Sequence, residues 1–362
     1  MDSLELLVQG QKLTDQQQAE LGQWMLSDVN RAIAFGLTPE TVQTTIQQQA
    51  QLLPQIYPQI LEFWQDDCQI SSLSLPTLWL VWMPLAWRLA EARRRQQRPY
   101  IQGILGMQGA GKTTLTRVLK IILQQLGYRC CCLSLDDFYK TYAERQQLQA
   151  DNPRLRWRGP PGTHDVDLGI RILDQFRGGE AAVVQIPRFN KSAYGGQGDR
   201  HGFEPVPAVD IVLFEGWFVG ARPIDSAHFE QAPAPIYTAA DCQFAAQMNQ
   251  QLYAYLPLWD RLDSLIVLNL ADYRLSKRWR QEAERKAIAA GKAGMSDAEV
   301  DEFVDYFWQA LHPELFVQPL VMQGQGTDLV MMVNVDHGIG AVYDPARISA
   351  TFSSRDPRNK SG

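Results

Sequence analysis

The sequence predicts an α/β fold, in which a mainly parallel sheet has helices on both faces and follows a helical N-terminal region. From Tyr100 onward, short apolar runs of strand length alternate with helical repeats, which favours a parallel sheet. The first 98 residues are instead rich in glutamine and carry helix signals, such as Thr14 followed by Gln17 in the form of a capping box. A glycine-rich loop at residues 106–111 separates the first predicted strand from a long amphipathic helix.

Six apolar runs are predicted as strands, at residues 101–105, 130–135, 181–186, 211–214, 265–270 and 329–335. Between the first two runs, apolar residues from Leu115 to Leu126 recur at helical spacing and stop at Gly127, a residue that commonly ends a helix. We therefore divide the chain into a helical region (1–98), an α/β domain (99–345) and a polar tail (346–362).

Composition restricts the partners that the protein is expected to have. A net charge of −6 and a pI near 5.5 argue against a general nucleic-acid binder. The longest apolar segment, 78–87, is interrupted by Pro84 and is too short to cross a bilayer, so no membrane partner is expected. A secretory signal has a basic region followed by an apolar one, and the N-terminus does not show this pattern. We expect a cytoplasmic protein with a small-molecule substrate, and the sequence leaves its oligomeric state open.

The segment 106–113 fits the phosphate-binding pattern G-x-x-x-x-G-K-[ST]. Its glycines allow backbone N–H groups to turn inward, and the helix that follows adds its positive dipole end. Lys112 is expected to reach the β- and γ-phosphates of a nucleoside triphosphate, and the Thr113 hydroxyl to bind Mg²⁺. The residues expected to contact the nucleotide in this loop are Gly106, Met107, Gln108, Gly109, Ala110, Gly111, Lys112, Thr113 and Thr114.

Acidic residues stand at the ends of two predicted strands. Asp136 and Asp137 follow the run 130–135, and Glu215 follows the run 211–214. Ligands of open α/β sheets bind at the carboxyl edge, so Asp136 is a candidate to accept the proton of an attacking hydroxyl or to hold the metal through water. Glu215 is a candidate for the carboxylate directed at Mg²⁺. Helix capping is the alternative for either aspartate, and an ion pair is the alternative for Glu215.

The loop after the third predicted strand is expected to bind a small anionic substrate. Segment 186–200 combines glycines with cationic and amide side chains, and arginine matches a carboxylate through two parallel hydrogen bonds. A solvated position is an equal alternative for Lys191. A rigid turn at 158–168 adds a histidine to this set. The candidate substrate-binding residues are His164, Arg188, Asn190, Lys191 and Arg200.

A cationic helix is predicted after the strand at 265–270. It carries Arg274, Lys277, Arg278 and Arg280, and such a helix can close over a phosphate site and exclude water. Arg274 and Arg278 are four residues apart and share a face. We therefore select Arg274 as a nucleotide contact and Arg278 as a catalytic cation.

Together, the phosphate loop, "SLDDFY", "FEGW" and the basic helix resemble the phosphoribulokinase, uridine kinase and pantothenate kinase group of P-loop small-molecule kinases. Within this group, "GTHDVDLG", "VQIPRFNKSAYGGQGDR" and "AGMSDAEV" are similar to the glycerate 3-kinase family, over about residues 100–336. The resemblance implies ATP-dependent phosphorylation of the glycerate 3-hydroxyl, a reaction of photorespiration. It also implies that Asp136 is the catalytic aspartate, Glu215 the Walker B acid, and Lys277 and Arg278 the lid cations.

Trp279 and Arg280 depart from the wider group, so the cation that contacts the γ-phosphate is not decided.

Two rival functions also stay open at this stage. A kinase of the same fold could act on a nucleoside, pantothenate or a sugar phosphate, although a pocket built from Arg188 and Arg200 suits an anion better than neutral uridine. A nucleotide-dependent switch would bind the nucleotide tightly and show no acceptor-dependent release of ADP.

Overall fold

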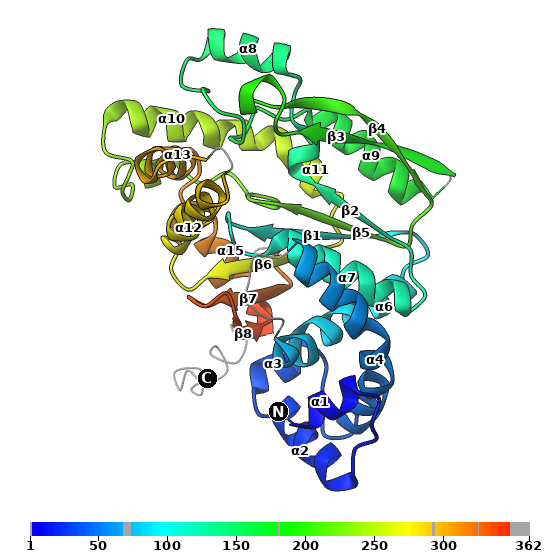
Figure 1. Ribbon diagram of the computed structural model, residues 1–362. Coiled ribbons are helices and arrows are strands. Elements are labelled where there is room, and N and C mark those ends of the chain that lie inside the picture. Colours follow the sequence, from blue (N-terminus) through cyan, green and yellow to red (C-terminus); the bar gives the residue numbers. More distant parts are fainter. Residues whose placement is uncertain (1, 68–73, 180–181, 292–293, 325, 348–362) are drawn as a thin grey trace, which may run out of the picture.

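The computed structural model describes residues 2–67, 74–179, 182–291, 294–324 and 326–347. Its centre is a six-stranded sheet in the order β2-β5-β1-β6-β7-β8. The strands are β1 (Tyr100–Gly106), β2 (Cys130–Ser134), β5 (Ile211–Gly216), β6 (Ser264–Leu270), β7 (Leu329–Val333) and β8 (Ile339–Tyr343). All neighbouring strands are parallel except β7 and β8. The predicted fold class is confirmed, because helices cover both faces of this sheet (Figure 1).

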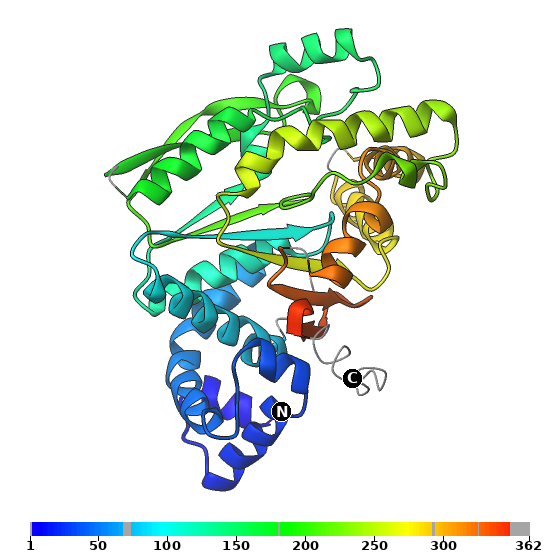
Figure 2. The same ribbon diagram turned by 180° about the vertical axis from the view of Figure 1, so that it is seen from behind.

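Side chains of β1 alternate between two apolar clusters, because successive residues of a strand point to opposite faces. Tyr100 and Ile104 join the cluster under α6 (Met83–Arg95) and α7 (Lys112–Gln125), which lie on one face. Ile101 and Leu105 join the cluster on the other face, formed with α9 (Val166–Gly178), α10 (Ala239–Gln251) and α11 (Leu256–Trp259) (Figure 2). Burial on both faces explains why these strands are continuous apolar runs in the sequence.

One predicted strand lies outside the main sheet. β3 (Val183–Asn190) pairs antiparallel with β4 (Asp199–Pro207) in a separate two-stranded sheet. The sequence analysis missed β4, which is mostly exposed and therefore has no continuous apolar run. It also missed β8. Residue 181, the predicted start of the third strand, lies outside the described residues, as do residues 348–362 of the predicted polar tail.

The first 95 residues form the helices α1 (Asp2–Val8), α2 (Asp15–Leu26), α3 (Val29–Ala34), α4 (Val42–Asp67), α5 (Leu75–Thr77) and α6, with a π-helical turn at Leu78–Trp82. Thr14 forms the predicted capping box with Gln17. Apolar residues of α4 and α6 belong to the same cluster as those of α7 and the sheet. No helix within the described ranges is long and apolar enough to cross a membrane.

The carboxyl ends of the parallel strands face a group of helices from the last third of the chain (Figure 1). These helices are α12 (Leu275–Ala289), α13 (Asp297–Ala310), α14 (Pro313–Phe316) and α15 (Gln318–Gln323). On the opposite side of the same edge lie α8 (Tyr142–Asp151) and the β3–β4 hairpin. The edge of the sheet is thus bordered by segments that come from three separate parts of the sequence.

Candidate active site

The phosphate-binding loop connects β1 to α7, as predicted. Gly109 and Gly111 have positive φ angles of 77° and 84°, a conformation that side chains with a Cβ rarely adopt. A Cβ at Gly109 would also lie 3.1 Å from the ring of Trp279. The Lys112 ammonium donates to the carbonyl of Met107 at 3.1 Å, so the lysine folds back across its own loop. The loop thus has the backbone shape that a phosphate cradle requires.

Glu215 stands next to this loop because β5 pairs with β1. In that pairing Glu215 lies opposite Ile104, two residues before the loop begins. The Thr113 hydroxyl donates to Glu215 Oε1 at 3.1 Å, so a hydroxyl and a carboxylate converge. Burial lowers the pKa of Lys112, and the Glu215 and Asp136 carboxylates oppose that shift. The predicted P-loop cation and the two predicted acids therefore share one electrostatic environment.

Asp136 and Asp137 follow β2 but have different surroundings. Asp137 accepts from the backbone N–H of Ser134 at 3.1 Å and from Arg188 at 3.0 Å, so it is a capping and ion-pairing residue. Burial raises the pKa of Asp137 in spite of these contacts. Asp136 pairs with Lys191 at 2.6 Å. Burial alone would raise the pKa of Asp136, but the Lys191 ammonium outweighs it, and the pKa falls below its ordinary value.

These groups line one cleft of about 740 Å³ at the carboxyl edge of the sheet. Its acidic side chains are those of Asp136 and Glu215. Aromatic walls come from Tyr139, Trp157, Trp217, Phe303 and Phe307. The cations that line it are Lys112, Arg145, Arg156, Arg158, Lys191 and Arg280. A cleft of this size, with cations gathered around a strand-end carboxylate, suits a nucleotide together with a small anionic substrate.

Four of the five predicted substrate-binding residues do not line the cleft. Arg188 pairs with Asp137 and, at 2.6 Å, with Glu204, while Arg200 bonds Asp165 at 3.1 Å. The Asn190 amide oxygen accepts from the backbone N–H of Ser192, in a local turn. The fourth, His164, lies behind Tyr139 and stacks on its ring. Of the five, only Lys191 reaches the cleft.

The structure places most cations of the basic helix outside the cleft. Arg274 pairs with Asp272, Arg278 with Glu282, and Lys277 with Asp305. None of these three cations is among the residues that line the cleft. Arg280 does line it, with an ion pair to Glu284 at 2.6 Å. Because Trp279 packs on Gly109 of the phosphate loop, α12 presents the next residue, Arg280, toward the cleft.

The sequence analysis missed three arginines of the cleft. Arg145 lies on α8, Arg156 lies just before the turn at 158–168, and Arg158 is the first residue of that turn. Arg145 is a structural residue, since it donates to the carbonyls of Lys140, Gln197 and Gly198. The alternating "RLRWRG" at 154–159 was the available signal, because cations interleaved with an aromatic residue just before a rigid turn are typical of a ligand-facing segment.

Arg158 has donors available for a ligand. Its Nη1 donates to the carbonyl of Gly196 at 2.6 Å, and its guanidinium lies over the rings of Tyr139 and Phe189. Within the described ranges, no acceptor is assigned to its other N–H groups. The next residue, Gly159, has a φ of 133°, and a Cβ there would lie 2.3 Å from Phe307 of α13. This backbone contact holds Arg158 against the wall of the cleft.

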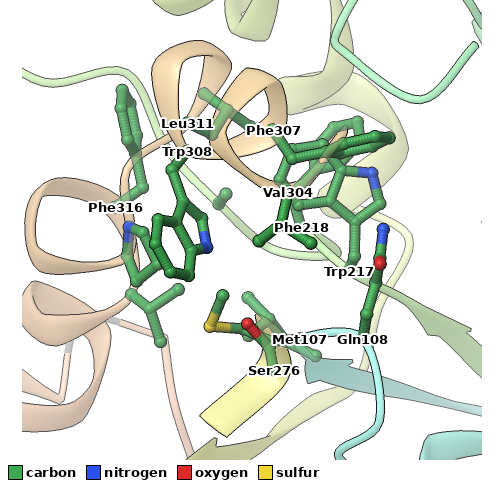
Figure 3. Close-up of a pocket in the computed structure, with 14 residues that line it drawn as sticks. Met107, Gln108, Trp217, Phe218, Ser276, Val304, Phe307, Trp308, Leu311 and Phe316 are labelled. Atoms are coloured by element: carbon green, nitrogen blue, oxygen red, sulfur yellow. The ribbon is translucent and has the colours of Figure 1, made fainter. Parts of the chain in front are cut away.

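A separate apolar cavity lies behind the phosphate loop (Figure 3). It encloses only about 30 Å³, and Gln108, Trp217 and Phe307 separate it from the cleft, because they line both spaces. Met107 and Trp308 also border it (Figure 3). The Trp308 Nε1 is buried and has no hydrogen-bond partner in the part of the chain that the structure describes. The cavity is far too small for a nucleotide, so it is a packing gap beside the site.

His164 is a buried neutral side chain next to Asp136. Tyr255 is fully buried, its oxygen accepts from the N–H of Gly162 at 2.9 Å, and its hydroxyl is hydrogen-bonded to His164 Nδ1 at 2.8 Å. Burial lowers the pKa of His164 from 6.5 to about 3. The ring therefore supports Tyr139 from behind without carrying a charge at neutral pH.

The shift in the pKa of His164 predicts a pH dependence of stability. Between pH 6.5 and 3 the unfolded chain binds a proton that the folded chain excludes, so the free energy of unfolding should fall as the pH falls. In the His164→Gln variant, the free energy of unfolding should fall by about 2 kcal/mol less than in the wild type between pH 7.5 and 5. Urea unfolding of both proteins across this range measures the difference. His228→Gln, at an exposed histidine, is the control. If this variant reduced the fall in the free energy of unfolding by the same amount, the pH dependence could not be assigned to His164.

No protein-family model matches the chain. The chain is 34% identical over 251 residues to the chloroplastic D-glycerate 3-kinase of Arabidopsis thaliana, covering 66% of this chain but only 53%, about half, of that protein's length. It is 36% identical over 228 residues to the uncharacterized kinase mug58 of Schizosaccharomyces pombe, and this match covers 60% of this chain and 82% of that protein. Among solved structures, the D-glycerate 3-kinase of Cryptococcus neoformans superposes with a TM-score of 0.64 at 26% identity, covering 72% of this chain and 97% of that one. With its phosphate loop and strand-end acids, the chain thus belongs to the P-loop small-molecule kinases, in the family that includes the D-glycerate 3-kinases.

Proposed function

We propose that the protein transfers the γ-phosphoryl group of ATP to the 3-hydroxyl of D-glycerate, which yields 3-phosphoglycerate and ADP. The observation that carries this proposal is the position of Asp136, in one cleft with the P-loop lysine and with the available donors of Arg158. A hydroxyl acid needs a carboxylate near its hydroxyl and a cation near its own carboxylate, and the cleft offers both. The name of the plant relative points to the same acceptor.

The residues around Thr113 fit a magnesium ion. Mg²⁺ prefers oxygen ligands and usually binds through one or two protein groups together with substrate phosphates and water. The Thr113 hydroxyl and the Glu215 carboxylate supply such a pair, and no group of three or more histidine, cysteine, aspartate or glutamate side chains in the described residues forms a complete metal cage. When bound there, Mg²⁺ would neutralise charge on the β- and γ-phosphate oxygens.

The chain's own residues then have distinct roles. The backbone of residues 106–111 holds the phosphates, and Lys112 exchanges its bond to Met107 for the β- and γ-phosphate oxygens. Asp136 orients the acceptor hydroxyl and accepts its proton. The acceptor oxygen bonds to the γ-phosphorus while the bond from that phosphorus to the β–γ bridging oxygen breaks, and the electron pair of that bond stays on ADP. Tyr139, whose hydroxyl also interacts with Asp136, keeps the carboxylate in place.

Arg158 is the proposed anchor of the glycerate carboxylate, in place of Arg188 and Arg200. The guanidinium can offer two parallel donors to a carboxylate, which lysine cannot. Its stacking on Tyr139 sets it beside the residue that contacts Asp136. The carboxylate and the 3-hydroxyl of one small molecule would thus be bound by adjoining groups.

A panel of acceptors tests the function. With ATP and Mg²⁺, D-glycerate should stimulate ADP formation by at least 10-fold over the basal rate, because its hydroxyl and carboxylate are close enough to bind to the adjoining groups Asp136 and Arg158. Pantothenate, uridine and ribulose 5-phosphate should each give less than a tenth of that stimulation. A coupled assay of ADP measures all four. A preference for another acceptor would reassign the substrate, and tight nucleotide binding with no acceptor effect would favour a nucleotide-dependent switch.

The two aspartates after β2 should differ in their effects on catalysis. Asp136→Asn keeps the shape and removes the base, so kcat should fall by about 10² to 10⁴, whereas affinity for ATP should change little. Asp137→Asn should lower stability and leave kcat within about 10-fold, because Asp137 bonds Ser134 and Arg188. Steady-state kinetics and urea unfolding of both variants separate these outcomes. A larger loss of kcat at Asp137 would mean that the base has been misidentified.

The acceptor anchor can be tested by a matched pair of substitutions. Arg158→Lys keeps the charge but loses the bidentate geometry, so KM for glycerate should rise by at least 10-fold while KM for ATP changes by less than 3-fold. Arg188→Lys, outside the cleft, should leave both KM values within about 3-fold. If KM for glycerate instead rises in Arg188→Lys and stays unchanged in Arg158→Lys, the glycerate carboxylate binds at Arg188. The hairpin must then move to bring Arg188 into the cleft.

A further inference from the structure

Lys191 lies where the β3–β4 hairpin meets the cleft. Its Nζ is 2.6 Å from Asp136 Oδ2, and 62% of its side chain is exposed. Lys112 lines the same cleft, close enough that Lys191 and Asp136 both influence its pKa. The P-loop cation, the proposed base and this second lysine are therefore immediate neighbours.

We propose that Lys191 is a catalytic residue that serves in turn as the counter-ion of Asp136 and as the cation that contacts the transferring phosphoryl group. The proposal rests on the proposed function, because it needs Asp136 to be the proton acceptor. It replaces the assignment of this second cation to Arg278 on the basic helix.

Distances support this role. A hydroxyl that gives its proton to Asp136 must lie about 2.6 to 3.2 Å from one of its carboxylate oxygens. The Lys191 ammonium now occupies such a position. An incoming acceptor must either displace the ammonium or lie beside it. When the acceptor lies beside it, Lys191 Nζ is within a few ångströms of the attacking oxygen, and therefore of the phosphorus to which that oxygen bonds.

The cations of the basic helix are paired with other acids. Arg274, Lys277 and Arg278 are paired with acids outside the cleft. Arg280 lines the cleft but pairs with Glu284, whose side chain is only 13% exposed. The acid that pairs with Lys191 in the described residues is Asp136 itself. Lys191 is therefore the cation that acceptor binding would release at the point of reaction.

The far end of the hairpin loop is anchored by two arginines. Arg145 donates to the carbonyls of Gln197 and Gly198, and Arg158 donates to that of Gly196. The ring of Phe189 packs where a Cβ of Gly198 would lie. The far end of the loop is held to the body of the protein, while the exposed side chain of Lys191 can turn without moving it.

The exchange of partners matches the chemistry of the step. While Lys191 is bound, it holds the pKa of Asp136 low, so the carboxylate is a weak base. When the ammonium turns to the phosphoryl oxygens, burial raises the basicity of Asp136 at the moment when the acceptor proton must be taken. That proton passes to Asp136, and Lys191 keeps its own protons throughout. A cation at the transferring group stabilises charge that develops in the transition state.

The test compares Lys191→Met and Lys191→Arg with Lys286→Met, an exposed lysine at the far end of α12. Calorimetry measures affinity for ADP alone and for ADP with aluminium fluoride and glycerate, which mimics the transferring phosphoryl group. We expect Lys191→Met to lose about 10²-fold of the affinity for the mimic and less than 3-fold for ADP. Lys191→Arg should recover part of the loss. The acidic limb of the profile of kcat/KM against pH should also move to higher pH in Lys191→Met.

Failure of the inference is distinguishable from failure of the proposed function. If the wild-type protein phosphorylates glycerate and Lys191→Met behaves like Lys286→Met in both measurements, the inference is wrong. A rise in KM for glycerate alone, with kcat and the pH profile unchanged, would also overturn it and make Lys191 an acceptor-binding residue. If glycerate does not stimulate ADP formation, the proposed function fails, and the same comparison with the acceptor found by the panel decides the role of Lys191.

Discussion

The site depends on the parallel pairing of β5 between β1 and β2. This pairing sets Glu215 opposite both Ile104 and Ser134, so three strand ends fall at one level of the sheet. The phosphate loop, Glu215 and the aspartate pair each lie at one of those ends. A shift of β5 by one residue would turn Glu215 to the opposite face of the sheet and remove it from Thr113. Because β5 is apolar and buried over its whole length, its register in the sheet is fixed, and this register also fixes the position of Glu215 beside Thr113.

The sequence predicted the parts of the site that depend on local order along the chain. The strand, the glycine loop and the helix carrying Lys112 follow one another directly, and the acids come immediately after buried strands. These features are visible because apolar runs report buried strands and glycines report a backbone that needs positive φ. The fold class and the positions of Lys112, Thr113, Asp136 and Glu215 in one cleft were predictable for this reason.

The direction of the long cationic side chains was not predictable. Arg188 has a side chain suited to a substrate contact, but it pairs with Asp137 after β2 and with Glu204 on β4. An arginine can take any of several partners within its reach, and the choice is made by tertiary packing that no local pattern records. Arg158 was overlooked for the opposite reason. Its position in the cleft follows from Gly159 lying against Phe307, a contact between residues that are 148 positions apart.

The gap of about 30 Å³ behind Met107 and Gln108 has a mechanical consequence. Atoms that border a gap have fewer dispersion partners on that side, so Met107 and Gln108 are less tightly packed there than residues in a close-packed core. Side chains at the loop can therefore be displaced toward the gap without compressing the surrounding core.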